Sequence, residues 1–459
     1  MNRRLLDAAR AVGGRLVGAD APFCAVSTDS RTLEAGALFV ALRGPNFDGA
    51  DFVAAAAAAG AAGALVERQL PLALPQLVVG DALRALQALA RTWRGQFRLP
   101  VVAVAGSNGK TSTKEMIGAI LARRGPCLAT RGNLNNHIGV PLTLLRLEAA
   151  HVAAVVEIGA NRIGDVAALL PLVRPTAGLV TNAGAEHLQG FGDLEGVARG
   201  EGETIAGLEA GASAVINADD AYAQYWRGLA GARRVVSFGL GDGADFRARE
   251  PHLGIERGEF VLRFTLDCPL GEAPIVMRAG GMHNVMNAAG AAAAAAAAGA
   301  ALDEIVAGLA EFRAVAGRLQ LKPGAHDSWI IDDSYNANPS SVRAGLDVLG
   351  GLAGVKWLVL GEMGELGASA AASHAEIGAY ARSRGVVRLF GLGPLSLRAV
   401  EAFGGGAEWF GDAEALTGRL LAQIGPGITL LVKGSRLNRL ERVVAALTAT
   451  AAGPAVRAG

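Results

Sequence analysis

A short run of glycine, lysine and threonine residues could bind the phosphates of a nucleotide. Gly106-Ser107-Asn108-Gly109-Lys110-Thr111 follows the apolar stretch Val101–Ala105, and apolar residues then recur at helical spacing. A strand, a glycine-containing loop and a helix N-terminus present backbone N–H groups to an anion. We expect Lys110 to reach the outer phosphates and the Thr111 hydroxyl to bind Mg²⁺. Val104 stands where the strict motif G-x-x-x-x-G-K-[ST] has its first glycine, so the alternative is an ordinary Gly-Lys turn before a helix.

Polar side chains also lie at the ends of two further predicted strands. Ala153–Ile158 carries Glu157 near its end, and Gly178–Thr181 is followed by Asn182 and His187. Ligands gather at the carboxyl ends of parallel strands, so we expect these residues to face the phosphate loop. Glu157 is expected to hold Mg²⁺ directly or through water, since Mg²⁺ prefers oxygen ligands. A satisfied structural carboxylate is the alternative for Glu157, and His187 taken alone could equally be structural.

Three other stretches are dense in polar residues. The Asn-rich run Gly132–Gly139 is either a turn or a loop over the phosphates or an acceptor substrate. Ser27–Arg31 could bind a ligand, but a turn is the simpler interpretation. His283-Asn284 and Asn287 precede the alanine run Ala291–Ala298, which is interpreted as a close-packed helix.

The elements that must position these residues alternate between strand and helix, which predicts three α/β domains. Residues 1–97 form a small N-terminal α/β domain, and residues 98–312 a central P-loop ATPase with a mainly parallel, doubly wound sheet. Residues 313–459 form a C-terminal Rossmann-like α/β domain without a G-x-G-x-x-G motif, so nothing supports a nicotinamide cofactor. The strands predicted outside the central domain are Ala37–Leu42, Ala64–Val66, Trp329–Ile331, Lys356–Leu360, Val386–Phe390 and Thr429–Val432, and the predicted helix is Phe52–Gly63. A further strand of the central domain is predicted at Ala214–Ile216.

Composition excludes several classes of protein. The chain has 459 residues, 51% of them hydrophobic, and a net charge of +1, which argues against a nucleic-acid-binding surface. The three cysteines, Cys24, Cys127 and Cys268, are isolated, as expected in a reducing cytosol. The N-terminus lacks a signal-peptide core, and the apolar run Phe52–Val66 is too short and glycine-broken for a membrane span. We therefore expect a soluble cytoplasmic protein, and the absence of heptads favours a monomer.

Together these motifs resemble the Mur ligases of peptidoglycan synthesis. Members of this family use a Gly-Thr/Ser-x-Gly-Lys-Thr loop, which the loop here matches. The resemblance spans nearly the whole chain and implies one domain for a UDP-sugar substrate, a central ATPase and a C-terminal domain for the incoming amino acid. It rests on residues 106–111, Asn133–Asn136, Glu157, Thr181-Asn182 with His187, His283-Asn284, Asn287, Gly317-Arg318 and Lys433–Arg436.

Within the family, the C-terminal runs Asp332–Pro339 and Leu360–Gly367 look like those of the last ligase, which adds D-alanyl-D-alanine. The N-terminal runs Thr28–Arg31 and Leu38–Gly44 resemble the domain shared by the third- and fourth-step ligases. The resemblance implies that ATP phosphorylates the terminal carboxyl of UDP-N-acetylmuramoyl-tripeptide and that the dipeptide amine attacks the acyl phosphate. Diaminopimelate and lysine both stay open as residue three of the tripeptide. The alternatives are a folylpolyglutamate synthase and a non-catalytic nucleotide-binding regulator.

The resemblance also implies roles for individual residues, with ATP and Mg²⁺ as cofactors and the tripeptide and D-Ala-D-Ala as partners. The catalytic residues are Lys110, His187 and Glu201, and the Mg²⁺ ligands are Thr111, Glu157, His187 and Glu201. ATP is bound by Gly106, Ser107, Asn108, Gly109, Lys110, Thr111, Ser112, Asn287, Arg318 and Asp333. The substrates are bound by Ser30, Arg31, Asn135, Asn136, Thr181, Asn182, Tyr335, Asn336, Lys433, Ser435 and Arg436.

One position departs from the family pattern. The family usually has a carbamylated lysine after the histidine loop, and the aligned stretch here, Arg199–Glu203, places Glu201 at that position. Our hypothesis is that the Glu201 carboxylate replaces the carbamate, which has the same charge and the same pair of oxygens, with a water bridging its shorter side chain to the metal. The alternative is that this role is lost and Glu201 only caps a helix face.

Overall fold

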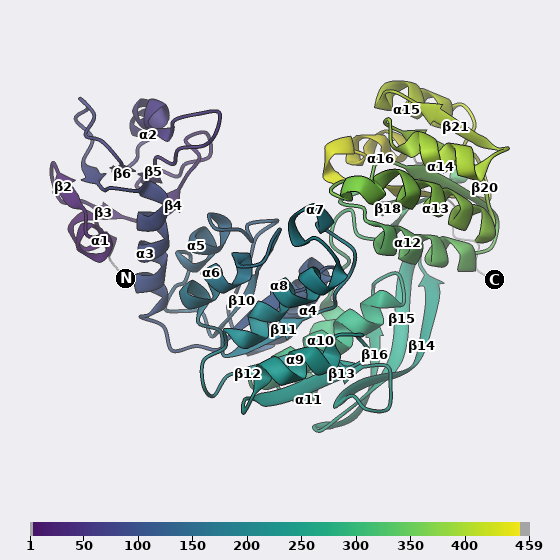
Figure 1. Ribbon diagram of the computed structural model, residues 1–459, viewed down its shortest axis with the longest axis horizontal. Coiled ribbons are helices and arrows are strands. Elements are labelled where there is room, and N and C mark those ends of the chain that lie inside the picture. Colours follow the sequence, from purple (N-terminus) through teal and green to yellow (C-terminus); the bar gives the residue numbers. More distant parts are fainter. Residues whose placement is uncertain (1–2, 450–459) are drawn as a thin grey trace.

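The computed structural model describes residues 3–449, which form three α/β units in chain order (Figure 1). Each unit is built on one main sheet, of five, nine and six strands in chain order, and the N-terminal unit also has a two-stranded sheet. The predicted fold class is therefore confirmed. The last ten residues of the predicted C-terminal domain lie outside the described residues. No helix within residues 3–449 is long and apolar enough to cross a membrane.

The N-terminal unit contains a mostly parallel sheet with strand order β2-β7-β6-β5-β4. The predicted helix Phe52–Gly63 is shorter in the structure, since α2 ends at Ala58 and the chain turns at Gly60, where φ is +88°. Apolar side chains of α3 share one core with the central unit, and Trp93 Nε1 donates to Leu147 O at 3.0 Å. Its elements are β1 (Arg3–Arg4), α1 (Leu5–Val12), β2 (Arg15–Val17), β3 (Pro22–Phe23), β4 (Val26–Ser27), β5 (Leu38–Val40), η1 (Gly49–Phe52), α2 (Val53–Ala58), β6 (Gly63–Val66), β7 (Gln76–Val78) and α3 (Ala82–Arg94).

The central unit carries the sheet β16-β15-β14-β13-β12-β11-β8-β10-β9, in which β8 to β14 run parallel. The predicted strands around residues 101, 153, 178 and 214 are present. Its strands are β8 (Val101–Ala105), β9 (Cys127–Ala129), β10 (Ala153–Glu157), β11 (Ala177–Val180), β12 (Ser213–Asn217), β13 (Arg234–Gly239), β14 (Phe246–Glu256), β15 (Glu259–Cys268) and β16 (Gly271–Met277). Its helices are α4 (Lys110–Leu121), η2 (Ala122–Arg124), α5 (Gly139–Leu144), α6 (Asp165–Val173), α7 (Leu188–Phe191), α8 (Leu194–Ala206), α9 (Ala223–Ala230), α10 (His283–Ala297) and α11 (Leu302–Glu311).

The alanine-rich helix α10 is buried along most of its length, as the alanine run predicted. Small side chains let it approach its neighbours closely, and a Cβ at Gly290 would lie 3.0 Å from the Phe238 ring. Dense packing of this kind supports α4, which packs against α10 and carries the phosphate loop at its N-terminus.

The sequence did not predict the antiparallel strands β14, β15 and β16 at one edge of the central sheet. The β14–β15 hairpin extends toward the C-terminal unit (Figure 1). Near its tip, Phe260 is buried in the same apolar cluster as Ile331 of the C-terminal unit, and a Cβ at Gly258 would lie 3.0 Å from the Trp329 ring. The tip of the hairpin therefore packs into the apolar core of the C-terminal unit and joins the two units.

The C-terminal unit carries the sheet β17-β18-β22-β19-β20-β21, in which only β17 pairs antiparallel. All four predicted strands are present, and β17 and β21 were not predicted. The elements are β17 (Gln320–Pro323), η3 (Ala325–Asp327), β18 (Trp329–Asp333), α12 (Pro339–Gly351), β19 (Val355–Leu360), η4 (Gly367–Ser369), α13 (Ala370–Ser383), β20 (Val386–Leu392), α14 (Ser396–Phe403), β21 (Ala407–Phe410), α15 (Ala413–Leu421), β22 (Ile428–Lys433), η5 (Arg436–Asn438) and α16 (Glu441–Thr448).

Candidate active site

The phosphate loop joins the end of β8 to the start of α4, as the sequence predicted. Its two glycines have φ angles of +118° at Gly106 and +85° at Gly109, which L side chains rarely adopt. A Cβ at Gly106 would collide with Thr181 Oγ1, and one at Gly109 with Asn287 Oδ1. Because Gly109 is the N-cap of α4 and has no side chain, the first-turn N–H groups stay available to an anion.

The loop after β11 packs directly against the phosphate loop. Asn182 Oδ1 accepts from the backbone N–H of Asn108 at 3.0 Å, and Asn182 Nδ2 donates to Asn108 O at 2.9 Å. The Ser107 hydroxyl exchanges hydrogen bonds with the backbone of Gly184. Thr181 and Asn182, which the sequence suggested as substrate-binding residues, therefore lie against the loop and help to hold its shape.

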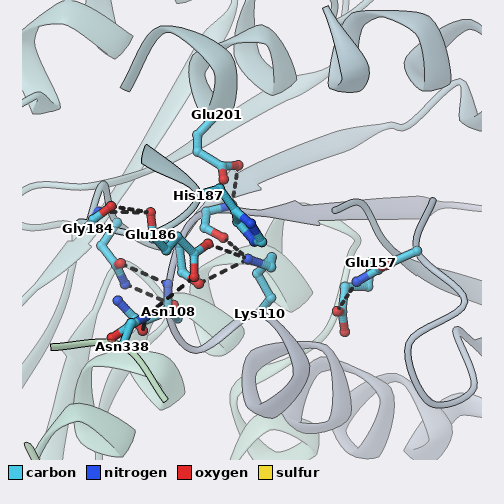
Figure 2. A network of polar contacts seen from close by, with 12 residues as sticks. Asn108, Lys110, Glu157, Gly184, Glu186, His187, Glu201 and Asn338 are labelled. Carbon is cyan, nitrogen blue, oxygen red and sulfur yellow. Dashed lines mark hydrogen bonds and ion pairs between the residues drawn. The ribbon is translucent and has the colours of Figure 1, made fainter. Parts of the chain in front are cut away.

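Lys110 is surrounded by oxygen acceptors (Figure 2). Its Nζ donates to Gly106 O, to Ser107 O at 3.0 Å and to Glu186 Oε1 at 3.0 Å. Burial pushes the pKa of Lys110 down, but the carboxylates of Glu186, Glu201 and Glu157 outweigh it and raise that pKa above its ordinary value. Lys110 is therefore a charged group that faces the side chains of three glutamates.

Glu157 ends β10 and offers an unsatisfied oxygen to the cavity. Its Oε1 accepts from Asn135 Nδ2 at 2.8 Å, whereas its buried Oε2 has no hydrogen-bond partner within residues 3–449. Thr111, Glu157 and His187 line the same cavity, which has a volume of about 420 Å³. Burying a carboxylate oxygen without a partner costs free energy unless a cation binds it. The side-chain oxygens of Thr111 and Glu157 therefore fit Mg²⁺.

His187 lies at the junction of two units. It has a left-handed backbone with φ of +49°, and its Nδ1 contacts the carboxylate of Glu365 from the C-terminal unit. Among the described residues, no group of three or more His, Cys, Asp or Glu side chains is close enough to hold a metal ion. A Mg²⁺ ion here would complete its coordination with Thr111, water and substrate oxygens.

Glu201 lies behind the phosphate loop on α8. Its Oε2 accepts from the backbone N–H of Gly106 at 2.6 Å, and the residue is 1% exposed. The pKa of Glu201 is raised to about 7, mainly by burial and also by Glu186, and the attraction of Lys110 opposes this rise. Glu201 does not line the cavity that contains Glu157 and His187. The structure therefore brings Glu201 to Gly106 and does not gather it with the other expected Mg²⁺ ligands.

The C-terminal unit closes the other side of the site. Lys433 Nζ donates to Asp333 Oδ2 at 2.6 Å and to Asn336 O at 3.0 Å. Burial favours the neutral forms, raising the pKa of Asp333 and lowering that of Lys433, while their mutual attraction opposes both effects. The Arg318 guanidinium lies 4.5 Å from the centre of the Tyr335 ring, and Arg436 lies over the same ring at 5.6 Å.

Two cavities adjoin at the phosphate loop. The second, of about 310 Å³, is lined by Ser112, Asn182, Asn287, Arg318 and Asp333, which the sequence mostly assigned to ATP. The first also collects most of the expected substrate residues, Asn135, Asn136, Tyr335, Asn336, Lys433, Ser435 and Arg436. Both cavities share Asn108, Gly109, Arg318, Ser341 and Lys433. A nucleotide at the loop would therefore contact two units at once.

Ser30 and Arg31 do not line either cavity. They lie in a turn of the N-terminal unit, where the Arg31 guanidinium pairs with Asp29 at 2.7 Å and is largely exposed. The turn interpretation of this stretch is confirmed, and a role in ligand binding stays a prediction.

Sequence reasoning missed three residues of the site, Glu186, Asn338 and Glu365. The signal for Glu186 was its position directly before His187, after a strand end. Asn338 precedes Pro339 at a helix start, which is typical of an N-cap, and it caps α12 through a bond from Ser341 N at 2.8 Å. No local pattern pointed to Glu365.

A larger cavity of about 780 Å³ lies elsewhere, at the opposite end of the central strands. Its basic side chains serve the fold, because Arg94 Nε donates to Val173 O at 2.9 Å and Arg124 Nη1 to Ala298 O at 3.3 Å. Both acceptors lie at helix carboxyl ends, where a guanidinium stabilises the helix dipole. None of the site residues predicted from the sequence lines this larger cavity.

Comparison with known proteins gives a consistent result along the chain. Residues 23–103 match the family model described as Mur ligase family, catalytic domain, residues 104–295 the Mur ligase middle domain, and residues 317–436 the Mur ligase, glutamate ligase domain. The UDP-N-acetylmuramoyl-tripeptide–D-alanyl-D-alanine ligase of Escherichia coli K12 is 44% identical over 439 residues, which is 95% of this chain and 96% of that protein.

Solved structures agree with the sequence match. A crystal structure of MurF from Acinetobacter baumannii superposes with a TM-score of 0.90 at 35% identity, covering 98% of this chain and 99% of that one. The MurF ligase of Thermotoga maritima, crystallised in complex with ADP, gives a TM-score of 0.81 at 26% identity over 93% of this chain and 97% of that one.

Proposed function

Because the chain belongs to the Mur ligase family, we propose that it joins D-alanyl-D-alanine to UDP-N-acetylmuramoyl-tripeptide while ATP is split to ADP and phosphate. The observation that carries this proposal is the full-length similarity to the E. coli ligase of that name. The site agrees with it, since the phosphate loop, Glu157 and the C-terminal residues around Lys433 meet at one cavity.

The chemistry requires activation of a carboxylate, because hydroxide is a poor leaving group for amide formation at neutral pH. Transfer of the γ-phosphoryl group to the tripeptide carboxylate forms an acyl phosphate, and the amine of D-Ala-D-Ala displaces phosphate from it. Phosphoryl transfer depends mainly on positioning and charge neutralisation, which the Lys110 ammonium and the α4 N-terminus supply. Thr111 and Glu157, with His187 nearby, would hold Mg²⁺, whose charge would reduce repulsion between the carboxylate and the phosphates.

The remaining site residues divide between the two substrates and ATP. Asn287, Arg318 and Asp333 would bind the nucleotide across the junction between units. Tyr335, Asn336, Lys433, Ser435 and Arg436 would bind the dipeptide or ATP, and Asn135 and Asn136 lie where they can contact the acceptor. The contact of the C-terminal unit with His187 and Asn108 would exclude the water that hydrolyses an acyl phosphate.

For Glu201 we propose the role of a carboxylate that replaces the family's lysine carbamate. Its burial and its contact with Gly106 support a place beside Lys110, from which a water would have to bridge it to the metal. Activity should not depend on added bicarbonate, whereas a Glu201→Lys variant should gain a bicarbonate dependence. A bicarbonate requirement of the unmodified protein would contradict this role.

We add three proposals, on the domain boundaries, the oligomeric state and the location of the protein. We place the domain boundaries between residues 97 and 98 and between residues 312 and 313. In support of this division, all strands of each main sheet lie within one of the three resulting segments. We propose that the protein acts as a monomer, since one chain supplies both sides of the cavity. We propose a cytoplasmic location, where ATP and UDP-linked substrates are made.

The test is phosphate release from ATP and Mg²⁺ by the purified protein, with the tripeptide substrate and D-Ala-D-Ala added separately and together, with and without bicarbonate. Tripeptides with diaminopimelate and with lysine are both assayed. We expect release only when both substrates are present. Nucleotide binding without release under these conditions would favour a non-catalytic regulator, and release with a folate acceptor would favour a folylpolyglutamate synthase.

A further inference from the structure

Glu186 is a buried carboxylate to which the chemistry above gives no role. Its side chain is 10% exposed and lies in the loop after β11. Oε1 accepts from Lys110 Nζ at 3.0 Å, and Oε2 accepts from Asn338 Nδ2 at 3.4 Å. Figure 2 shows the carboxylate between these two side chains. Glu186 therefore connects the phosphate loop of the central unit to the first turn of α12 in the C-terminal unit.

Asn338 is fixed in the orientation that this contact needs. Its Oδ1 accepts from Ser341 N and caps α12, so its Nδ2 faces the central unit. That nitrogen also donates to Asn108 Oδ1 at 2.8 Å, and Asn108 Nδ2 donates to Ser340 Oγ at 3.1 Å. The helix cap and the contact between units thus use opposite ends of one amide group.

All three hydrogens of the Lys110 ammonium already have acceptors. A phosphate oxygen can bind Lys110 only if it replaces one of them. Two acceptors are backbone carbonyls of the phosphate loop itself, and the third is the Glu186 side chain. Rotation of one side chain rearranges less structure than a change of loop backbone, so Glu186 is the acceptor that phosphate replaces.

The charges favour the same exchange. Glu186 is the largest attractive influence on Lys110, and a phosphate group next to that carboxylate would repel it. Of the two side chains that bond to the Glu186 carboxylate among the described residues, Asn338 is the one that remains once Glu186 no longer contacts Lys110. Binding of phosphate thereby strengthens the contact between Glu186 and the C-terminal unit.

We propose that Glu186 is a positioning residue that holds Lys110 until a nucleotide phosphate replaces it and then, through Asn338, couples the occupied phosphate loop to the docked C-terminal unit. The inference rests on the proposed ATP-dependent ligation. Glu186 needs no contact with the reacting atoms for this role.

The first test is the Glu186→Gln variant, which keeps the shape and removes the charge. We expect Mg²⁺ and β,γ-methylene-ATP to bind about five- to tenfold more tightly by calorimetry, because a neutral acceptor competes less well for Lys110 than a carboxylate does. We expect kcat for phosphate release to fall at least about fivefold, because the coupling to Asn338 is weakened. Glu195→Gln, an exposed position on α8, is the matched control and should change neither value.

If Glu186 had only a structural role, the Glu186→Gln variant would change nucleotide affinity and kcat in the same direction or change neither. Unchanged or weaker nucleotide binding by Glu186→Gln would overturn the exchange at Lys110. Calorimetry uses no acceptor substrate, so this result is independent of the ligase assignment. Absence of phosphate release by the unmodified protein would instead contradict the proposed function.

The second test uses Asn338→Asp, which keeps the α12 cap because Asp and Asn are equally good N-caps. It removes the amide donor and places a carboxylate opposite Glu186. We expect an unchanged helix content by circular dichroism, a kcat lowered about tenfold and no gain in nucleotide affinity. The double variant Glu186→Gln with Asn338→Asp reverses donor and acceptor, so kcat should recover above that of Asn338→Asp alone. A double variant no more active than Asn338→Asp would overturn the coupling.

Discussion

Replacing Glu201 by glutamine should make the protein more stable at pH 8 and leave its stability at pH 4.5 nearly unchanged. Glu201 is buried at 1% exposure, and burial raises its pKa from 4.5 to about 7. Between these pH values the folded protein keeps the proton that the unfolded chain has lost. Stability from this group is therefore present below pH 4.5 and falls as the pH rises toward 7.

The size of the effect follows from the pKa difference. At about 1.4 kcal/mol per pH unit, the rise from 4.5 to about 7 corresponds to about 3 kcal/mol. The glutamine side chain of the Glu201→Gln variant has no proton to lose, and its oxygen can still accept from Gly106 N. The difference in unfolding free energy between variant and unmodified protein should therefore grow from about 0 at pH 4.5 to about 3 kcal/mol at pH 8.

The assay is urea unfolding at pH 4.5, 6 and 8, in EDTA and without nucleotide, so that no cation stabilises the ionised carboxylate. The three units can unfold separately, so midpoint shifts are compared transition by transition. Comparing two proteins at each pH cancels the titration of all other groups. Glu195→Gln on the same helix is the control and should show no pH-dependent difference. If the unfolding free energies of Glu201→Gln and the unmodified protein change with pH in the same way, the raised pKa of Glu201 and its assignment to burial are wrong.

Three further substitutions test other parts of the structure. Glu157→Gln should raise the Mg²⁺ concentration for half-maximal phosphate release at least about tenfold, because it removes the charge of the unpartnered oxygen; an unchanged Mg²⁺ titration would contradict that role. Lys110→Met should lower kcat at least about a hundredfold while the circular dichroism spectrum stays the same, since it removes a preorganised charge at the phosphates; activity near the original level would place the chemistry elsewhere. Gly308→Ala should destabilise the protein by about 1–3 kcal/mol in urea, despite the better helix propensity of alanine, because its Cβ would meet the Ile120 backbone; a more stable variant would show that α11 can shift.

The sequence predicted the parts of the fold that depend on local pattern. Buried parallel strands such as Val101–Ala105 are continuous apolar runs, and the polar residues after them had to share one sheet edge. The hairpin Phe246–Cys268 was missed because charged residues and Pro251 interrupt the apolar positions of its first strand, and because its tip packs against a distant part of the chain.

The missed site residues have a related cause. Glu186 acquires its second partner only when Asn338 arrives from a part of the chain more than 150 residues away. The place of Glu201 depends on a backbone N–H group at Gly106, and side-chain types in the sequence do not reveal such a partner. Contacts between units and bonds to backbone are the features that one-dimensional patterns leave out.

The packing of the β14–β15 hairpin tip in the C-terminal core has a consequence for how the site can open. On one side of the junction, Phe260 is embedded in apolar core that water cannot replace cheaply. On the other side, Asn108, Asn338 and Ser340 make polar bonds that water can replace at little net cost. If the C-terminal unit rotates relative to the central unit, we therefore expect the rotation to be centred on the hairpin tip. One angle of rotation would then set how far the site opens, and Lys433 and Arg436 would return to the same place when it closes.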